Sequence, residues 1–430
     1  MRQKLKELTQ KPFVRNVMVM ATGTVAAQVV TLLLSPIITR LYGPEAYGLM
    51  GVFLAIVTVV TPIATLTYPI AIVLPKSDIS AKRLICLSLF IALIMSIVVS
   101  FLLLFFNQSI IKIFQIEEIG PFIYLIPLVI IFSAFLQVAE QWLIRTNQFK
   151  VTAKVVFMQA VILQGSKVGI GLFYPFASVL IFISAIGIGL RAWMMIFFSD
   201  KTALKLSNSH EPEVSYISLA KNHIDFPLYR APQALVSAVS QSLPILLLST
   251  FFGPASAGLY SIGRNVLSLP TQVIGRAIGN VFYPRINEAA NSNENLSKII
   301  SKVTIILILL GILPFGSIIA FGPSLFSFIF GDEWMKAGDY ARWISLWSFT
   351  VFIYQPCIKA LPVLRAQAFH LYFTVLTLII QVIFLGVGYY IFKSDLIAIA
   401  MLGISSAGIN ITLILMTLKK SREFDHSKIN

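Results

Sequence analysis

The sequence is built from about twelve apolar stretches, each about 20 residues long, the length an α-helix needs to cross a bilayer. Few folds are open to such a chain, because backbone groups in lipid must find hydrogen-bond partners within the protein. Hydrophobic residues make up 57% of the 430 residues and charged residues only 12%, which excludes an ordinary soluble domain. We therefore expect an all-α polytopic membrane protein. The expected spans are 16–39, 48–73, 84–106, 122–143, 155–174, 177–198, 225–251, 257–283, 299–321, 343–361, 371–392 and 396–418.

A short motif occurs twice, as GPEAYGL at 43–49 and as GPASAGL at 253–259, each time between two apolar stretches. Such internal repetition indicates two related halves. Six expected spans, an even number, separate the copies, so both halves enter the bilayer with the same orientation. Parallel six-helix lobes are typical of transporters. The Gly-Pro pairs predict tight turns between the first two helices of each half.

Polar stretches and basic residues divide the chain further. About 22 of the 33 Lys and Arg residues fall on one side of the expected spans, which predicts that both termini are cytoplasmic. This pattern also accounts for the net charge of +15, so we expect no nucleic-acid partner. The predicted segments are a cytoplasmic amphipathic arm (1–15), an N-lobe (16–198), a cytoplasmic linker (199–222), a C-lobe (223–418) and a basic tail (419–430).

Five basic residues lie inside the expected spans: Lys167, Arg191, Arg230, Arg264 and Arg276. Exposure to lipid would cost about 2.5 to 3.5 kcal/mol for each one near a helix centre. The carboxylates near the spans, Glu140 and Asp225, are too few to neutralise them. The sequence thus favours a cationic cavity, while Arg191, Arg230 and Arg276 lie close enough to the cytoplasmic ends to reach lipid headgroups instead.

Polar side chains at intervals of three and four residues form stripes on four expected helices. Such stripes either line a watery cavity or join helices through hydrogen bonds. Their convergence with surplus positive charge favours a polar cavity between the lobes. The predicted lining includes Gln28, Gln137, Gln233, Ser237 and Gln241; the stripes are Thr24-Gln28-Thr31-Ser35, Thr58-Thr61-Thr65-Tyr68, Ser133-Gln137-Glu140 and Arg230-Gln233-Ser237-Gln241.

Several local motifs resemble those of polysaccharide-biosynthesis flippases of the Wzx type, which belong to the MOP superfamily. The resemblance covers essentially the whole chain. The motifs are Arg15-Asn16, SPIITRLYGP at 35–44, AIVLPKS at 71–77, Gly253-Pro254, AGLYS at 257–261 and FYPR at 282–285.

The resemblance implies two six-helix lobes, like those of multidrug and toxic compound extrusion (MATE) transporters, around a central cavity. It implies a flippase that moves undecaprenyl-diphosphate-linked oligosaccharides across the bacterial inner membrane, beside a polymerase and a chain-length regulator, for O-antigen, capsule or exopolysaccharide synthesis. Arg230, Arg264 and Arg276 would then bind the diphosphate or acidic sugars. Lys167 and Arg191 would shape the opposite wall of the cationic cavity. Members of the superfamily couple transport to H⁺ or Na⁺ gradients, for which Glu140 and then Asp225 are the candidate carboxylates.

Two other functions remain open at this stage. A multidrug exporter has the same fold, but its cationic drugs favour embedded carboxylates over a basic cavity. A membrane-embedded polymerase or ligase of glycan chains needs catalytic groups, and the sequence has no paired acid and base and no metal-ligand spacing. We expect neither catalytic residues nor a metal or other cofactor.

Overall fold

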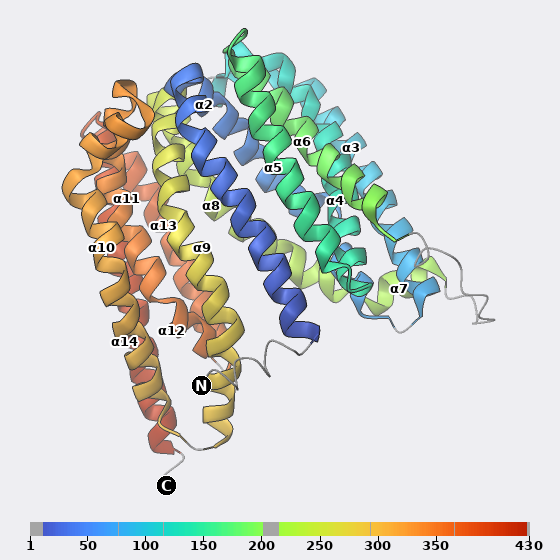
Figure 1. Ribbon diagram of the computed structural model, residues 1–430, viewed down its shortest axis with the longest axis vertical. Coiled ribbons are helices and arrows are strands. Elements are labelled where there is room, and N and C mark those ends of the chain that lie inside the picture. The colour runs from blue at the N-terminus through green and yellow to red at the C-terminus, as the bar shows by residue number, and fades with distance from the viewer. Residues whose placement is uncertain are drawn as a thin grey trace. The chain divides into compact units, whose positions relative to one another are not determined.

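The computed structural model describes residues 12–75, 77–114, 116–200, 215–292, 294–364 and 366–427, which form helices joined by short turns (Figure 1). No β-strand occurs within these ranges. The α-helices are α2 (Pro12–Ala64), α3 (Asp78–Phe114), α4 (Ile126–Arg145), α5 (Phe149–Gly171), α6 (Ala177–Phe198), α7 (Tyr216–Asn222), α8 (Ala231–Phe252), α9 (Pro254–Asn291), α10 (Leu296–Phe330), α11 (Met335–Ile353), α12 (Gln355–Ala360), α13 (Gln367–Tyr390) and α14 (Asp395–Ser427).

Each of the twelve expected spans coincides with helix, which confirms the all-α membrane fold. Within the described ranges, eight helical stretches are long and apolar enough to cross a membrane. The first, Thr22–Ala64, covers most of the first two expected spans, 16–39 and 48–73. Three more of the expected spans are helices with a larger share of polar residues, α5, α9 and α11. The protein is therefore a multi-pass membrane protein.

The second expected span ends earlier than its apolar pattern predicts. Helix α2 stops at Ala64, and Leu66 and Thr67 then take left-handed conformations with φ of 48° and 58°. A short 3₁₀ helix, η1 (Tyr68–Val73), completes the segment. Pro69 lacks the backbone N–H that would continue the α-helical pattern, which accounts for the break.

Both copies of the repeated Gly-Pro pair have the same backbone geometry. Gly43 has φ 68° and ψ 172°, and Gly253 has φ 86° and ψ 167°. This conformation is open essentially to glycine alone, and the proline that follows is suited to the first turn of the next helix. Helix α2 therefore consists of two helices that meet at a kink at Gly43. Gly253 lies between α8 and α9 in the same way. The predicted turns are confirmed.

Replacement of Gly43 by alanine is expected to destabilise the protein by about 1 to 3 kcal/mol, because alanine is strained in this conformation. Thermal unfolding of the purified protein in detergent measures the effect. Gly165→Ala is the matched control, since Gly165 is helical and a Cβ there would meet nothing within 4 Å. Equal melting temperatures for Gly43→Ala and the wild type would contradict the proposed role of the turn.

The described residues up to Leu246 form one compact unit, here called unit 1. In it α2 and α5 run side by side (Figure 1) and approach closely. A Cβ on Gly23 would lie 2.6 Å from the Cβ of Ala153, and the Tyr42 hydroxyl donates to the Lys167 carbonyl at 2.8 Å. Helices α3, α4 and α6 share apolar cores around Leu84, Trp142, Leu143, Met194 and Met195.

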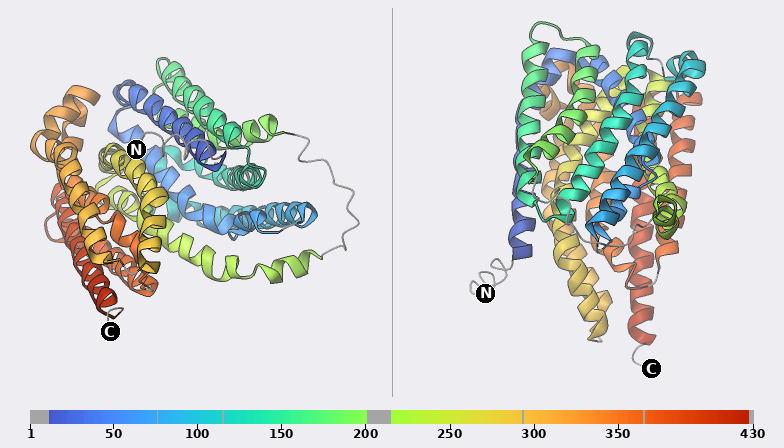
Figure 2. Two further views of the ribbon diagram at one scale, coloured as in Figure 1. Left: turned by 60° about the horizontal axis from the view of Figure 1, so that its bottom comes forward. Right: turned by 90° about the vertical axis from the view of Figure 1, so that its right-hand side faces the viewer.

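The described residues from Leu247 onwards form unit 2. Helices α10 and α11 meet at Gly322 and Gly338, where a Cβ on Gly338 would lie 2.4 Å from the Gly322 carbonyl oxygen. At the start of α14, the Asp395 carboxylate accepts hydrogen bonds from Ser256, Lys336 and Tyr340. This carboxylate therefore joins α9 and α11 to α14. Figure 2 shows the long helices of this unit from two further sides.

Three predicted segments lie partly outside the described residues: the N-terminal arm at 1–11, the linker at 201–214 and the end of the basic tail at 428–430. The described end of the linker is α7, which packs against α3 and η1 within unit 1. The Tyr68 hydroxyl donates to the Ala220 carbonyl at 3.2 Å, and the Arg83 guanidinium lies 5.8 Å from the centre of the Tyr216 ring.

Candidate functional site

Unit 1 contains a polar pocket of about 490 Å³ whose walls come from α2, α4, α6 and α8. We refer to it as the unit-1 pocket. Thr58 and Thr61 lie on α2, Glu140 on α4, and Ser237 and Gln241 on α8. Its full lining is Leu54, Val57, Thr58, Thr61, Pro62, Ser133, Leu136, Gln137, Glu140, Ile188, Ala234, Ser237, Ala238 and Gln241.

Helical periodicity explains why the polar residues face one space. Thr58 and Thr61 are three positions apart, as are Gln137 and Glu140, and Ser237 and Gln241 are four apart, so each pair lies on one helix face. The structure therefore brings together residues from three of the four predicted stripes. The threonines donate to carbonyls of their own helix, Thr58 to Leu54 and Thr61 to Val57, both at 2.7 Å. Their oxygens remain available as acceptors.

An ion pair stands at this pocket. Arg191 Nη2 of α6 donates to Glu140 Oε1 at 2.7 Å, and the two side chains are 28% and 33% exposed. Arg145 lies five residues after Glu140 on the same helix, but it does not pair with Glu140. Arg145 instead pairs with Asp78 at 2.8 Å and donates to the Ile72 and Pro75 carbonyls. The pairing of Glu140 with Arg191 was missed, although their positions along the helices indicate it. Glu140 and Arg191 each lie within about two turns of the end of their helix, α4 and α6, and so at a similar depth.

Two buried donors beside the ion pair have no hydrogen-bond partner among the described residues. They are Gln137 Nε2 and Arg191 Nε. The other end of the Gln137 amide is held, since its Oε1 accepts from the Thr65 hydroxyl at 3.2 Å. Buried polar groups are nearly always paired, and leaving one unpaired costs about 1 to 3 kcal/mol. Of these two residues Gln137 lines the pocket, so its amide is the donor that suits an acceptor on a ligand there.

The other predicted residues of this unit lie elsewhere. Lys167 is 7% exposed and packs inside the helices, with Nζ 3.6 Å from Met50 Sδ. Arg230, Gln233 and Asp225 are exposed and do not line the pocket.

The first predicted stripe faces α5 rather than the pocket, since Gln164 donates to Thr31 at 3.4 Å. Gln28, in the same stripe, is half-buried and also lies outside the lining.

Two predicted arginines belong to α9 in unit 2. Arg264 is half-buried one turn after Tyr260, whose buried hydroxyl has no hydrogen-bond partner in the described part of the chain. Nothing is described of the Arg276 side chain, although its backbone is helical.

The chemistry of the unit-1 pocket is that of binding. Its lining combines hydroxyls, amides and one carboxylate, Glu140, whose partner Arg191 lies outside the lining. Such hydroxyls and amides suit the hydroxyl groups of sugars. Among the described residues, no group of three or more His, Cys, Asp or Glu side chains is placed to hold a metal ion.

Comparison with known proteins gives one family and several relatives. A family model described as a polysaccharide biosynthesis protein matches residues 37–339. The succinoglycan biosynthesis transport protein ExoT of Rhizobium meliloti (strain 1021) is 23% identical over 358 residues, which are 80% of this chain and 66% of ExoT. The chain therefore spans just under two thirds of that relative.

Two solved structures share the fold. A structure of the lipid II flippase MurJ in an inward closed conformation has a TM-score of 0.73 and 12% identity, covering 96% of this chain and 91% of its own. An inward-facing multidrug resistance MATE family transporter of the MOP superfamily has a TM-score of 0.66 and 12% identity, covering 93% and 98%. The fold is thus that of MATE and MurJ transporters.

Proposed function

Because this chain belongs to the polysaccharide biosynthesis protein family, we propose that it is a flippase that moves lipid-linked oligosaccharide units across a membrane. The names of its relatives support this class: one is a succinoglycan biosynthesis transport protein and another a lipid II flippase. We assign undecaprenyl-diphosphate-linked oligosaccharides as substrates and the cytoplasmic to outer leaflet as the direction. The basic side of the chain, with both termini, then faces the cytoplasm, and the membrane is a bacterial inner membrane.

The observation that carries the proposal is the set of polar side chains that line the unit-1 pocket, among them Gln137, whose amide Nε2 has no partner among the described residues. Gln137 Nε2 and Arg191 Nε lack acceptors among the described residues, in helices long enough to cross a membrane. Sugar hydroxyls and phosphate oxygens supply acceptors. Ser237, Gln241 and the threonine oxygens add the mixed donor and acceptor groups that a carbohydrate requires.

The ion pair offers a way to couple binding to a gradient. A phosphate that takes over the Arg191 guanidinium releases the Glu140 carboxylate, which is then free to take up H⁺ or Na⁺. The cation taken up by Glu140 offsets one negative charge that the phosphate brings beside Arg191, which links substrate binding to cation uptake. Glu140 is therefore our coupling candidate in preference to Asp225, which lies outside the pocket lining.

One observation favours a second function, cation-coupled export of cationic drugs. The unit-1 pocket contains a carboxylate, Glu140, the group that a cationic drug would use. Its 2.7 Å contact with Arg191 already satisfies that charge, so the flippase remains the better-supported function.

Replacement of Gln137 by leucine is expected to lower flipping about tenfold or more, because it removes both hydrogen-bonding groups of the amide, the unpartnered NH2 donor and the carbonyl acceptor. The measurement is leaflet-resolved labelling of lipid-linked oligosaccharide in cells that lack the wild-type gene and carry the variant.

Gln141→Leu is the matched control, because Gln141 is on the same helix but does not line the pocket. Normal delivery of lipid-linked units to the outer leaflet in cells lacking the protein, with no other carrier active, would overturn the flippase function. Loss of drug resistance in those cells would then support the exporter. Wild-type flipping by Gln137→Leu would overturn the role of the pocket alone.

A further inference from the structure

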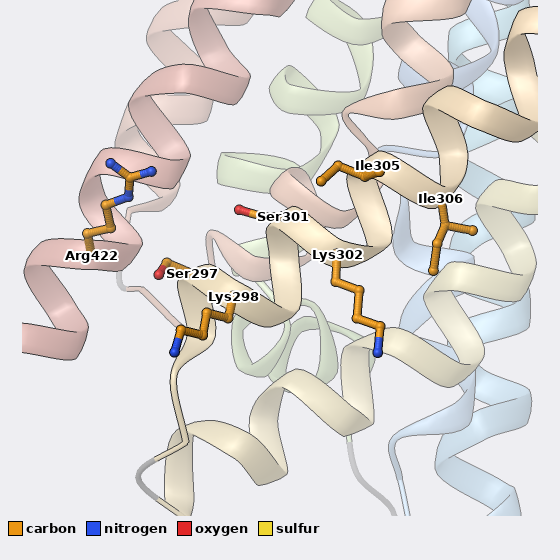
Figure 3. Close-up of a pocket in the computed structure, with 7 residues that line it drawn as sticks. All are labelled: Ser297, Lys298, Ser301, Lys302, Ile305, Ile306 and Arg422. Carbon is orange, nitrogen blue, oxygen red and sulfur yellow. The ribbon is translucent and has the colours of Figure 1, made fainter.

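A basic groove of about 550 Å³ lies in unit 2, where the start of α10 meets the end of α14 (Figure 3). We call it the α10–α14 groove. Neither the family nor the proposed transport of sugars assigns a role to it. It is lined by Ser297, Lys298, Ser301, Lys302, Ile305, Ile306 and Arg422.

The lining carries three positive charges and no carboxylate. Lys298, Lys302 and Arg422 are exposed, and none forms an ion pair with another described residue. Figure 3 shows the Ser301 hydroxyl directed toward the side of the groove formed by α14. A guanidinium, two ammonium groups and a hydroxyl together suit a phosphate.

Nearby acidic groups are already engaged. The Asp425 carboxylate accepts the backbone N–H groups of Leu296 at 2.9 Å and of Ser297 at 3.0 Å. Glu294 is bound by the Arg285 guanidinium at 2.6 and 3.0 Å, a hydrogen bond that lowers the pKa of Glu294. Glu294 is thus neutralised by Arg285, whereas Asp425 keeps one negative charge beside the groove, so the three cations of the lining leave the groove positive.

The same Asp425 contact positions the groove. It joins the end of α14 to the first turn of α10, and Arg422 lies one turn before it on α14. Asn295 fixes the other side of that turn, because its side chain accepts from the Lys298 N–H at 2.9 Å and from the Ser297 hydroxyl at 2.8 Å. Protein groups thus already occupy the N–H groups at the start of α10, so the side chains are left to bind the ligand.

An apolar surface continues from the groove along α10. Ile305 and Ile306 are 55% and 45% exposed, and Leu309 and Leu313, one and two turns further, are 67% and 80% exposed. These turns belong to a helix that is long and apolar enough to cross a membrane. A ligand that fits has a phosphate at one end and hydrocarbon at the other.

We propose that the α10–α14 groove binds the phosphate headgroup of an anionic phospholipid, whose acyl chain lies along the exposed face of α10. The charge of the groove selects an anionic over a zwitterionic lipid, and the adjoining apolar face selects a lipid over a free anion. This site is separate from the unit-1 pocket in its residues and in its ligand.

Native mass spectrometry of the purified full-length protein tests the proposal. The protein is taken from micelles that contain phosphatidylglycerol or, separately, phosphatidylcholine. We expect one phosphatidylglycerol to be retained, and the double variant Lys298→Gln with Lys302→Gln to lower its occupancy at least fivefold. The matched control, Lys150→Gln with Lys221→Gln, removes the same charge from exposed positions of unit 1. This control protein should retain phosphatidylglycerol as the wild type does.

An equal fall in phosphatidylglycerol occupancy in the control pair would overturn the proposal, because the lipid would then respond to the positive charge of the whole surface and not to the groove. Equal retention of phosphatidylcholine would also overturn it. Displacement of the lipid by millimolar inorganic phosphate would identify a site for free anions instead.

Asp425→Asn tests the positioning role of the carboxylate. It keeps one acceptor for the backbone but loses the other, so α14 is held less firmly against α10. We expect phosphatidylglycerol occupancy to fall by about two- to fivefold even though the substitution removes a negative charge beside the groove, whereas Asp425→Glu should leave occupancy near that of the wild type. Unchanged occupancy in Asp425→Asn would contradict this role.

Discussion

Replacement of Glu140 by alanine is expected to abolish coupled transport and to destabilise the protein by about 1 to 3 kcal/mol. The substitution leaves the Arg191 guanidinium without its 2.7 Å partner at membrane depth. Breaking a fully buried pair costs about 3 to 5 kcal/mol, and the roughly 30% exposure of both side chains reduces that figure here. If the loss acts on the transport-competent state, transport falls by about 5- to 150-fold. Flipping in proteoliposomes and thermal unfolding measure the two effects.

Two further variants separate charge from structure. The double variant Glu140→Ala with Arg191→Ala removes both charges, so it should recover stability without recovering transport. Glu140→Gln retains a hydrogen-bond acceptor for Arg191 and should fold well, yet lose the dependence of flipping on the ion gradient. Wild-type, gradient-dependent flipping by Glu140→Ala at normal membrane levels would rule out the coupling role of the ion pair.

Replacement of Gly322 by leucine is expected to prevent α10 from packing on α11. A Cβ at Gly322 would lie 2.6 Å from the Gly338 carbonyl oxygen, which belongs to the backbone and has no alternative rotamer. Overpacking usually costs about 1 to 3 kcal/mol, and we expect about 3 kcal/mol or more because the helices themselves must separate. The corresponding fall in melting temperature is about 6 to 12 °C for a unit of this size.

Gly316→Leu on the same helix is the matched control. A Cβ at Gly316 would meet nothing within 4 Å, so leucine has room there and gains helix propensity. Scanning fluorimetry in detergent compares the two variants. Equal melting of Gly322→Leu and Gly316→Leu would show that the close helix contact does not limit stability.

The local features of the fold follow from local sequence. Hydropathy over about 20 residues predicted the spans, because each membrane helix satisfies its own backbone. The duplicated Gly-Pro pairs predicted the turns at Gly43 and Gly253, since few residues other than glycine tolerate such a backbone. The end of α2 at Ala64 is the exception, because its apolar pattern continued through the break that precedes η1.

The candidate site depends both on the spacing of residues in the sequence and on the packing of helices in the structure. Residue spacing predicted which residues share a helix face, such as Gln137 with Glu140 and Ser237 with Gln241. It could not predict that these faces surround one pocket, nor that Lys167 packs inside the helices beside Met50. Spacing specifies the direction of a side chain on its own helix and carries no information about the neighbouring helix.

By itself, then, the sequence determined a twelve-span membrane protein with a repeated plan and polar helix faces. Only the tertiary structure decided that Glu140 pairs with Arg191, that Gly322 meets Gly338 and that Asp425 holds α14 against the start of α10. The physical reason is the separation along the chain of the residues that interact. Helix formation and membrane crossing depend on residues within a few turns, whereas these contacts join residues that are distant in the chain and depend on how whole helices pack.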